Sequence, residues 1–197
     1  MKRLLITLAL AATVGGAAAQ GAPCPDNSNL SEVTSSNSPQ DMAFHKKMMH
    51  RACRLAEKSV KKGGGPFGAV ITKDGKIVAE SSNSVTLDND PTAHAEVNTI
   101  RKACQNLGTF DLTGCVIYTS AEPCPMCFGA IYWAHLDHIY YGNDKREAAN
   151  IGFDDDFIYK ELEIDPKERR TKMEQLLPEE AIRAFQMWSD KTDKTEY

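Results

Sequence analysis

The sequence lacks an excess of basic residues. Its 197 residues include 23 lysines and arginines against 27 aspartates and glutamates, which gives a formal net charge of −4. A moderately acidic surface has no general attraction for polyanions, so we expect no nucleic-acid partner. The short basic clusters at residues 61–62 and 169–170 are typical of solvated faces.

The sequence also lacks an uninterrupted apolar run of the roughly 20 residues that a spanning helix needs. Residues 4–14 are apolar, but two glycines follow directly. Lys2 and Arg3 precede this run and Ala17-Ala18-Ala19 follows it, the pattern of a secretory signal with an Ala-x-Ala cleavage site. We predict a signal peptide over residues 1–19 and a mature protein that is periplasmic or secreted, with no membrane association after cleavage. The alternative is an uncleaved membrane anchor.

Internal repeats and a second domain are not apparent either. Residues 20–37 are rich in Ser, Asn, Pro and Gly and have little to bury, which predicts a flexible leader. Ser38-Pro39 is a helix start, with Ser as the cap and Pro at the first position. We therefore predict one domain over residues 38–197.

The order of elements in this domain predicts the fold class. Asp74-Gly75 between two β-rich runs is a strong hairpin signal. The pattern gives helix, hairpin, helix, strand, helix and strand, over residues 38–62, 67–82, 90–107, 115–120, 123–133 and 138–141. Such alternation predicts an α/β layered domain with a mixed sheet. The pattern weakens after Gly142, where we expect short helices and a polar tail.

Two short segments 30 residues apart carry the chemistry. His94 and Glu96 lie in the first, and Cys124 and Cys127 lie in the second, within Pro-Cys-Pro-Met-Cys. One imidazole and two thiolates suit a catalytic zinc site, because three protein ligands leave the fourth tetrahedral position to water. Zinc lowers the pKa of that water to about 7, so a zinc hydroxide nucleophile forms at neutral pH. Glu96 would shuttle protons to the substrate.

A Cys-x-x-Cys pair with a distant His also occurs in structural zinc sites and in redox dithiols. A structural site needs a fourth ligand, which no nearby residue offers at an obvious spacing. A redox dithiol needs neither His94 nor Glu96. Both alternatives are weaker than catalytic zinc.

Four cysteines lie outside the metal motif: Cys24, Cys53, Cys104 and Cys115. Export would permit disulfides, and four cysteines allow three pairings. Cys104 ends a predicted helix and Cys115 begins the next strand, so these two are the candidate pair. Buried free thiols are the alternative.

The pattern H-x-E with P-C-x-x-C matches the signature of zinc nucleobase deaminases. From about Asp41 to Tyr197 the chain resembles the cytidine deaminase-like superfamily, and within it the guanine deaminase branch. The stretches that carry the resemblance are Gly64–Val70, Asn89–Glu96, Pro123–Cys127, Gly129–Ala134, and above all Gly152–Glu161 with the ending Glu196-Tyr197. The resemblance implies a three-layer α-β-α fold with a central mixed sheet of about five strands.

It also implies the function and the site. Residues 38–197 would be a zinc-dependent deaminase domain, with one Zn²⁺ per subunit, that hydrolyses the purine base guanine to xanthine and ammonia. His94, Cys124 and Cys127 would bind zinc and Glu96 would be catalytic. The substrate would contact Asn83, Phe67, Ala95, Trp133, Asp155 and Tyr197. A homodimer with exchanged C-terminal segments would let Tyr197 close the partner's pocket.

Two alternatives to this function remain. The first keeps the chemistry but changes the substrate to cytosine, guanosine, another nucleoside, or adenosine in transfer RNA. The acidic charge, the export signal and the lack of a basic terminal helix weigh against RNA. The second is a non-enzymatic exported zinc-binding domain. Ammonia release from a panel of purines would separate this non-enzymatic domain from a deaminase.

Overall fold

The computed structural model describes residues 38–196. The predicted signal peptide, the predicted leader with Cys24, and Tyr197 lie outside the described residues. Among the helices of the described part, none is long and apolar enough to cross a membrane.

Four strands form one mixed sheet in the order β2-β1-β3-β4. The strands are β1 (Gly68–Lys73), β2 (Lys76–Ser82), β3 (Cys115–Ala121) and β4 (His138–Asn143). β1 pairs antiparallel with both β2 and β3, whereas β3 and β4 are parallel. The predicted hairpin is confirmed, and Asp74 and Gly75 at its turn both have positive φ.

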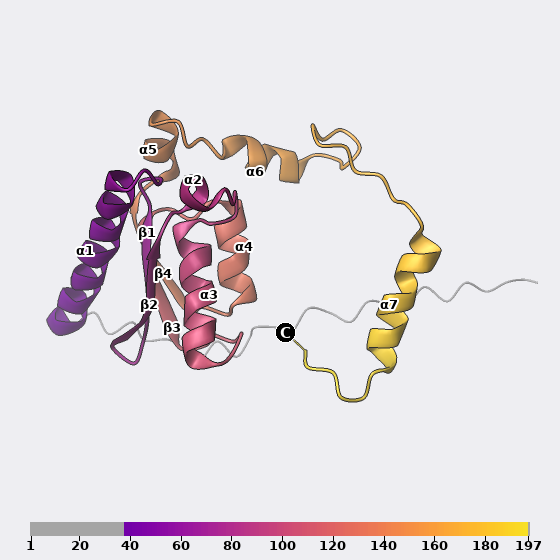
Figure 1. Ribbon diagram of the computed structural model, residues 1–197, viewed down its shortest axis with the longest axis horizontal. Helices are drawn as coiled ribbons and strands as arrows, with labels where there is room; N and C mark the ends of the chain where they lie inside the picture. Colours follow the sequence, from indigo (N-terminus) through magenta and orange to yellow (C-terminus); the bar gives the residue numbers. More distant parts are fainter. Residues whose placement is uncertain (1–37, 197) are drawn as a thin grey trace, which may run out of the picture. The chain divides into compact units, whose positions relative to one another are not determined.

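Helix α1 (Pro39–Lys61) covers one face of this sheet (Figure 1). Its start is the predicted one, because Ser38 is the N-cap and its Oγ accepts from the Asp41 N–H. Met48 and Ala52 of α1 pack on Val70 and Tyr118 of the sheet. The fit is close: a Cβ on Gly68 would lie 2.4 Å from the Ala52 carbonyl oxygen, so only glycine lets α1 approach β1 here.

Helices α3 (Ala95–Leu107) and α4 (Pro125–Trp133) cover the opposite face. Side chains alternate across a strand, so Ile71 and Ile117, the sequence neighbours of Val70 and Tyr118, point into this second core. The result is the expected three-layer α-β-α arrangement. The described residues form four strands where about five were expected, because the chain beyond β4 turns into helices.

The remaining helices are short or lie beyond the sheet. They are α2 (Val85–Asp88), α5 (Lys145–Asn150), α6 (Asp156–Glu163) and α7 (Pro178–Asp190). The predicted start of the second helix near Asp90 is wrong, because the Asp90 side chain accepts from the Thr92 N–H in a turn. α3 begins at Ala95 instead, with His94 as its N-cap.

The cysteines of the described residues are free thiols. Cys104 and Cys115 belong to the same apolar cluster, as their predicted proximity requires, but no disulfide joins them. Burial raises the pKa of both thiols, which keeps them protonated at neutral pH.

Candidate active site

Two helix N-termini bring the three predicted metal ligands together. His94 is the N-cap of α3 and Cys124 is the N-cap of α4, and neither side chain caps its own helix. Both side chains are therefore directed at the metal position. Cys127 lies in the first turn of α4 and is almost fully buried. The positive ends of both helix dipoles favour the thiolates that metal binding requires.

The geometry of these three residues fits zinc. Nδ1 of His94 lies 3.5 Å from Sγ of Cys124 and 3.4 Å from Sγ of Cys127. In a tetrahedral site with Zn–N near 2.0–2.1 Å and Zn–S near 2.3 Å, such atoms stand roughly 3.6 Å apart. Across the described residues, the metal-competent group consists of these three side chains. Within residues 38–196, no fourth protein ligand closes the site, so the geometry is that of an open, catalytic centre rather than a structural one.

The pKa values of these three side chains are shifted in different directions. A hydrogen bond with Cys127 lowers the pKa of Cys124 to about 4, and His94 adds to the effect. The same bond, with burial and the neighbouring Glu96, raises the pKa of Cys127. The hydrogen bond to Cys124 also raises the pKa of His94. A divalent cation would displace these protons, because zinc binds thiolates and neutral imidazole.

Glu96 lies beside the ligands without joining them. It is in the first turn of α3 and its side chain is buried. Thr119 of β3 donates to its Oε1 at 2.8 Å, and Cys127 Sγ lies 3.4 Å from its Oε2. Burial raises the pKa of Glu96, which suits a carboxyl group that accepts and releases a proton.

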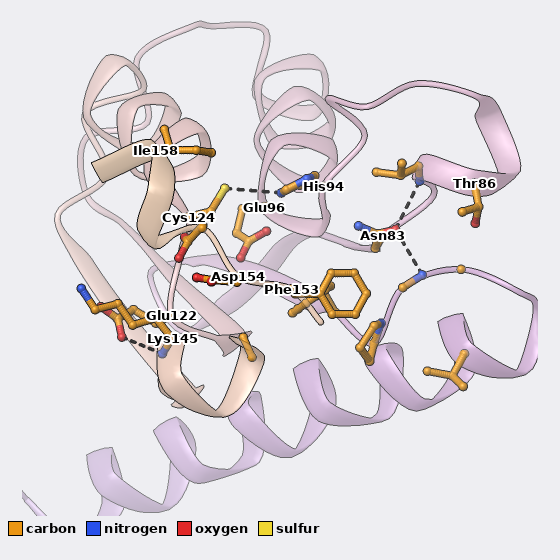
Figure 2. A pocket seen from close by; sticks show the side chains of 18 of the residues that line it. Asn83, Thr86, His94, Glu96, Glu122, Cys124, Lys145, Phe153, Asp154 and Ile158 are labelled. Carbon is orange, nitrogen blue, oxygen red and sulfur yellow. Dashed lines mark hydrogen bonds between the residues drawn. The ribbon is translucent and has the colours of Figure 1, made fainter. Parts of the chain in front are cut away.

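The metal ligands open onto a cavity of about 640 Å³ (Figure 2). His94, Glu96 and Cys124 line its floor. The rest of its wall comes from residues within 60–67, 83–86 and 145–158, and from Glu122. A cavity of this size accommodates a small planar ligand.

Asn83 lies at the end of β2 and lines this cavity. Its Oδ1 accepts from the N–H groups of Gly65 and Val85, both at 3.2 Å. These two donors fix the orientation of the amide, so the Nδ2 donor is on the side toward His94 and Glu96 (Figure 2). The arrangement offers a ligand one oriented hydrogen-bond donor.

Phe67 and Asp155 also line the cavity. The Phe67 ring meets Phe153 edge to face, with centroids 4.9 Å apart. Burial and the nearby Cys124 raise the pKa of Asp155.

The other two described candidates are placed elsewhere. Ala95 is fully buried, and its side chain belongs to the core under α3. Trp133 is 68% exposed and does not line the cavity. It ends α4, roughly 13 Å of helix rise after Cys124. The structure thus does not place Trp133 in this cavity, and its contact with the substrate stays a prediction.

Several lining residues were missed by sequence reasoning: Glu122, Lys145, Phe153, Asp154 and Ile158. Glu122 precedes the cysteine motif directly, and its Oε2 accepts from the Lys145 N–H at 3.1 Å. That bond ties the cysteine loop to α5. Adjacency to the motif is the signal that would have found Glu122. The others follow β4 and reach the cavity only through the fold.

The family is now clear. Residues 42–143 match the model of the cytidine and deoxycytidylate deaminase zinc-binding region, so the chain belongs to this family. With its open His/Cys/Cys centre, it is a zinc-dependent hydrolytic deaminase.

Within that class the chain is similar to the guanine deaminase of Bacillus subtilis. The two are 51% identical over 154 residues, covering 78% of this chain and 99% of the relative. The X-ray structure of that enzyme matches with a TM-score of 0.76, covering 78% of this chain and 98% of that one. The resemblance predicted from the sequence is confirmed, as is zinc as the cofactor.

Two further comparisons are more distant. The tRNA-specific adenosine deaminase of Aquifex aeolicus is 35% identical over 131 residues, covering 66% of this chain and 83% of the relative. The structure of guanine deaminase from Nitrosomonas europaea is 30% identical with a TM-score of 0.54, covering 60% of this chain and 65% of that one.

Proposed function

We propose that the protein hydrolyses guanine to xanthine and ammonia. The observation that carries this proposal is the 51% identity to a guanine deaminase across nearly its whole length, which includes the segment after β4. That segment supplies Phe153, Asp154 and Asp155 to the cavity wall. We infer that these three residues contact the substrate, next to the residues that bind zinc.

The cavity offers complementary groups to a purine. Phe67 presents an aromatic surface against which a planar base packs. The Nδ2 group of Asn83 donates to an acceptor on the ring, and the carboxylate of Asp155 accepts from ring N–H groups. The backbone N–H of Ala95, at the start of α3, is a further donor next to the metal ligands.

A zinc ion would be held by His94, Cys124 and Cys127, and when bound it would supply a water activated for attack at the purine carbon that carries the amine. Glu96 would accept a proton during this attack and deliver protons to the ring nitrogen and to the leaving amine. Thr119 donates to Oε1 of Glu96 and so fixes the orientation of its carboxyl group. Protonation of the amine is required because ammonia leaves far more readily than amide anion.

The test is ammonia release by purified, zinc-loaded protein from guanine, guanosine, adenine, cytosine, cytidine and a transfer-RNA anticodon stem. We expect guanine to be the preferred substrate by kcat/KM. Preference for another base would replace guanine while keeping the chemistry. No ammonia from any of them would support a non-enzymatic zinc domain.

The proposal includes a homodimer with exchanged C-terminal segments. Support comes from α7, where Ile182, Phe185 and Trp188 form a stripe at helical spacing yet are 46%, 74% and 43% exposed. An isolated helix of 13 residues is marginal in water without such a stripe being buried. A second copy of the chain would bury it and bring Tyr197 to the partner's cavity.

The proposal also includes export, which rests on the sequence of residues 1–19 alone. N-terminal sequencing of protein recovered outside the inner membrane should begin at Gln20. Recovery of full-length chain from the cytoplasm would contradict it.

A further inference from the structure

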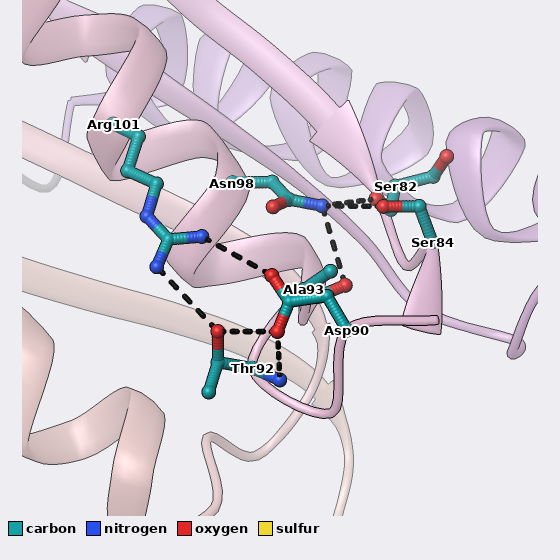
Figure 3. A network of polar contacts seen from close by, with 7 residues as sticks. All are labelled: Ser82, Ser84, Asp90, Thr92, Ala93, Asn98 and Arg101. Carbon is teal, nitrogen blue, oxygen red and sulfur yellow. Dashed lines mark hydrogen bonds and ion pairs between the residues drawn. The ribbon is translucent and has the colours of Figure 1, made fainter. Parts of the chain in front are cut away.

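Asn98 lies in the second turn of α3 and does not line the cavity that holds the metal ligands. Its amide nitrogen is within hydrogen-bond distance of three oxygens: the Ser82 carbonyl at 3.2 Å, the Ser84 hydroxyl at 3.0 Å and the Ala93 carbonyl at 3.2 Å (Figure 3). The amide has two hydrogens, so they are shared among three acceptors. One side chain thus joins two separate loops.

The two loops carry different parts of the site. Ser82 and Ser84 flank Asn83, the oriented donor in the cavity. Ala93 precedes His94, whose side chain is a zinc ligand. One backbone bond also joins them directly, from the Ser84 N–H to the Ala93 carbonyl at 3.0 Å. Asn98 therefore bridges the loop of the proposed substrate donor and the loop of the first metal ligand.

The surroundings show why this contact is needed. A second, polar cavity of about 390 Å³ lies on this side of the loops. Ser82, Ser84, Asn98 and Arg101 are among the residues that line it. On the far side, Arg101 approaches Asp90 and Thr92 and supports the turn before Ala93 (Figure 3). On the Ser82–Ser84 side, Asn98 and the Ser84 N–H together link the two loops.

We propose that Asn98 is a positioning residue, which pins the Asn83 loop to the His94 loop and so holds Asn83 at the right place for the base. The part of this statement that concerns the base rests on the proposed function. Asn98 itself touches neither metal nor substrate.

The same helix offers a matched control. Nδ2 of Asn106 donates to the Val78 carbonyl of β2 at 2.8 Å, so Asn106 also ties α3 to β2, two turns beyond Asn98 and far from the site. Asn98→Asp replaces the amide NH₂ donor by a carboxylate, which would face the three oxygen acceptors. Asn98→Ala removes the amide donor without adding a charge. Asn106→Asp and Asn106→Ala make the same changes elsewhere. Zinc content and thermal unfolding verify folding of all four zinc-loaded, full-length variants.

The first measurement needs no substrate. We expect hydrogen exchange of the Ser84 and Val85 amides to accelerate about tenfold or more in both Asn98 variants, as the loop opens more often. The Asn106 variants should leave these two amides unchanged. Equal rates in Asn98 variants and wild type would overturn the proposal. So would equal acceleration by the Asn106 variants.

The second measurement is binding and turnover. We expect both Asn98 variants to raise KM for guanine and Kd for 8-azaguanine about tenfold, with zinc content unchanged. In an Asn83→Ala background, Asn98→Ala should add less than about twofold, because the two residues act as a unit. If Asn98→Ala raised KM and Kd by the full tenfold in the Asn83→Ala background as well, the positioning role would be overturned. Failure of the wild type to bind or deaminate guanine would refute the proposed function, while the exchange rates still decide whether Asn98 pins the loops.

Discussion

The hydroxyl of Thr119 donates a hydrogen bond of 2.8 Å to Oε1 of Glu96, and both side chains are buried. A central strand of the sheet thus orients the carboxyl group that lies beside the metal ligands. The orientation does not depend on a loop, since Thr119 is held in β3 by its pairing with Ala69 of β1.

Replacing Thr119 by valine should reduce kcat without loss of zinc. Valine keeps the shape but leaves a buried carboxylate oxygen without its donor, which costs about 1–3 kcal/mol. We expect kcat to fall at least about fivefold, in line with that cost. Thr119→Ser retains the hydroxyl and is the control. Equal kcat in Thr119→Val and wild type would show that this bond does not orient Glu96.

Glu96→Gln should retain zinc and lose turnover. Glutamine has nearly the same volume but cannot carry the proton, and general acid–base catalysis contributes about 10²–10⁴-fold. His94→Ala, by contrast, should lose both zinc and activity. The measurements are metal content by mass spectrometry and ammonia release. Full activity in Glu96→Gln would remove Glu96 from the mechanism.

Mixed dimers test whether the C-terminal segment is exchanged. A Glu96→Gln chain and a chain lacking Tyr197 should each be inactive alone. If Tyr197 closes the partner's pocket, a dimer assembled from one of each has one complete site. We expect activity to appear on mixing after dissociation and reassembly. No activity in verified mixed dimers would mean that each tail serves its own chain.

Zinc should protect two cysteines from alkylation. In the zinc-loaded protein, a thiol reagent should label the exposed Cys53 quickly and should not label Cys124 or Cys127. After a chelator, Cys124 should react first, because its pKa is lowered to about 4 and it is the less buried of the two. Peptide mapping of the labelled sites provides the measurement. Rapid labelling of both motif cysteines before chelation would contradict zinc protection.

The ion pair between Arg51 and Glu80 should make part of the stability depend on pH. The hydrogen bond from Arg51 lowers the pKa of Glu80 below its usual 4.5. A lowered carboxyl pKa stabilises the fold above pH 4.5, and this contribution is lost as the pH falls through the folded-state value. The pair is partly exposed, so it contributes at most about 1 kcal/mol.

Glu80→Gln should therefore be less stable than wild type at pH 7, with the difference shrinking toward pH 3. Denaturant unfolding at several pH values measures it. A difference that stays constant or grows in acid would contradict this assignment.

The sequence predicted correctly those helix starts and turns that depend only on neighbouring residues. The Ser38-Pro39 start of α1 and the Asp74-Gly75 turn need only neighbouring residues, and both are as predicted. The metal triad was predictable because its spacing is itself the signature. The start of α3 was not predictable from the sequence. An Asp90 carboxylate can either cap a helix or close a turn, and only the tertiary structure selects the turn.

The cavity wall was predicted in part for a related reason. Phe67 and Asn83 were identified through the family resemblance, whereas Lys145 and Ile158 reach the cavity from helices that follow β4. The three hydrogen bonds of the Asn98 amide could not be predicted from the sequence either. Their acceptors are oxygens of residues in two loops that only the fold brings together.

The cavity wall beyond Asn143 has a consequence for how such enzymes diverge. The three ligands, Glu96 and Asn83 all lie within residues 42–143, the part that the zinc-binding family shares. Phe153, Asp155 and Ile158 come from outside it. Selection can therefore change the final quarter of the chain to admit a different heterocycle while the metal ligands are inherited intact.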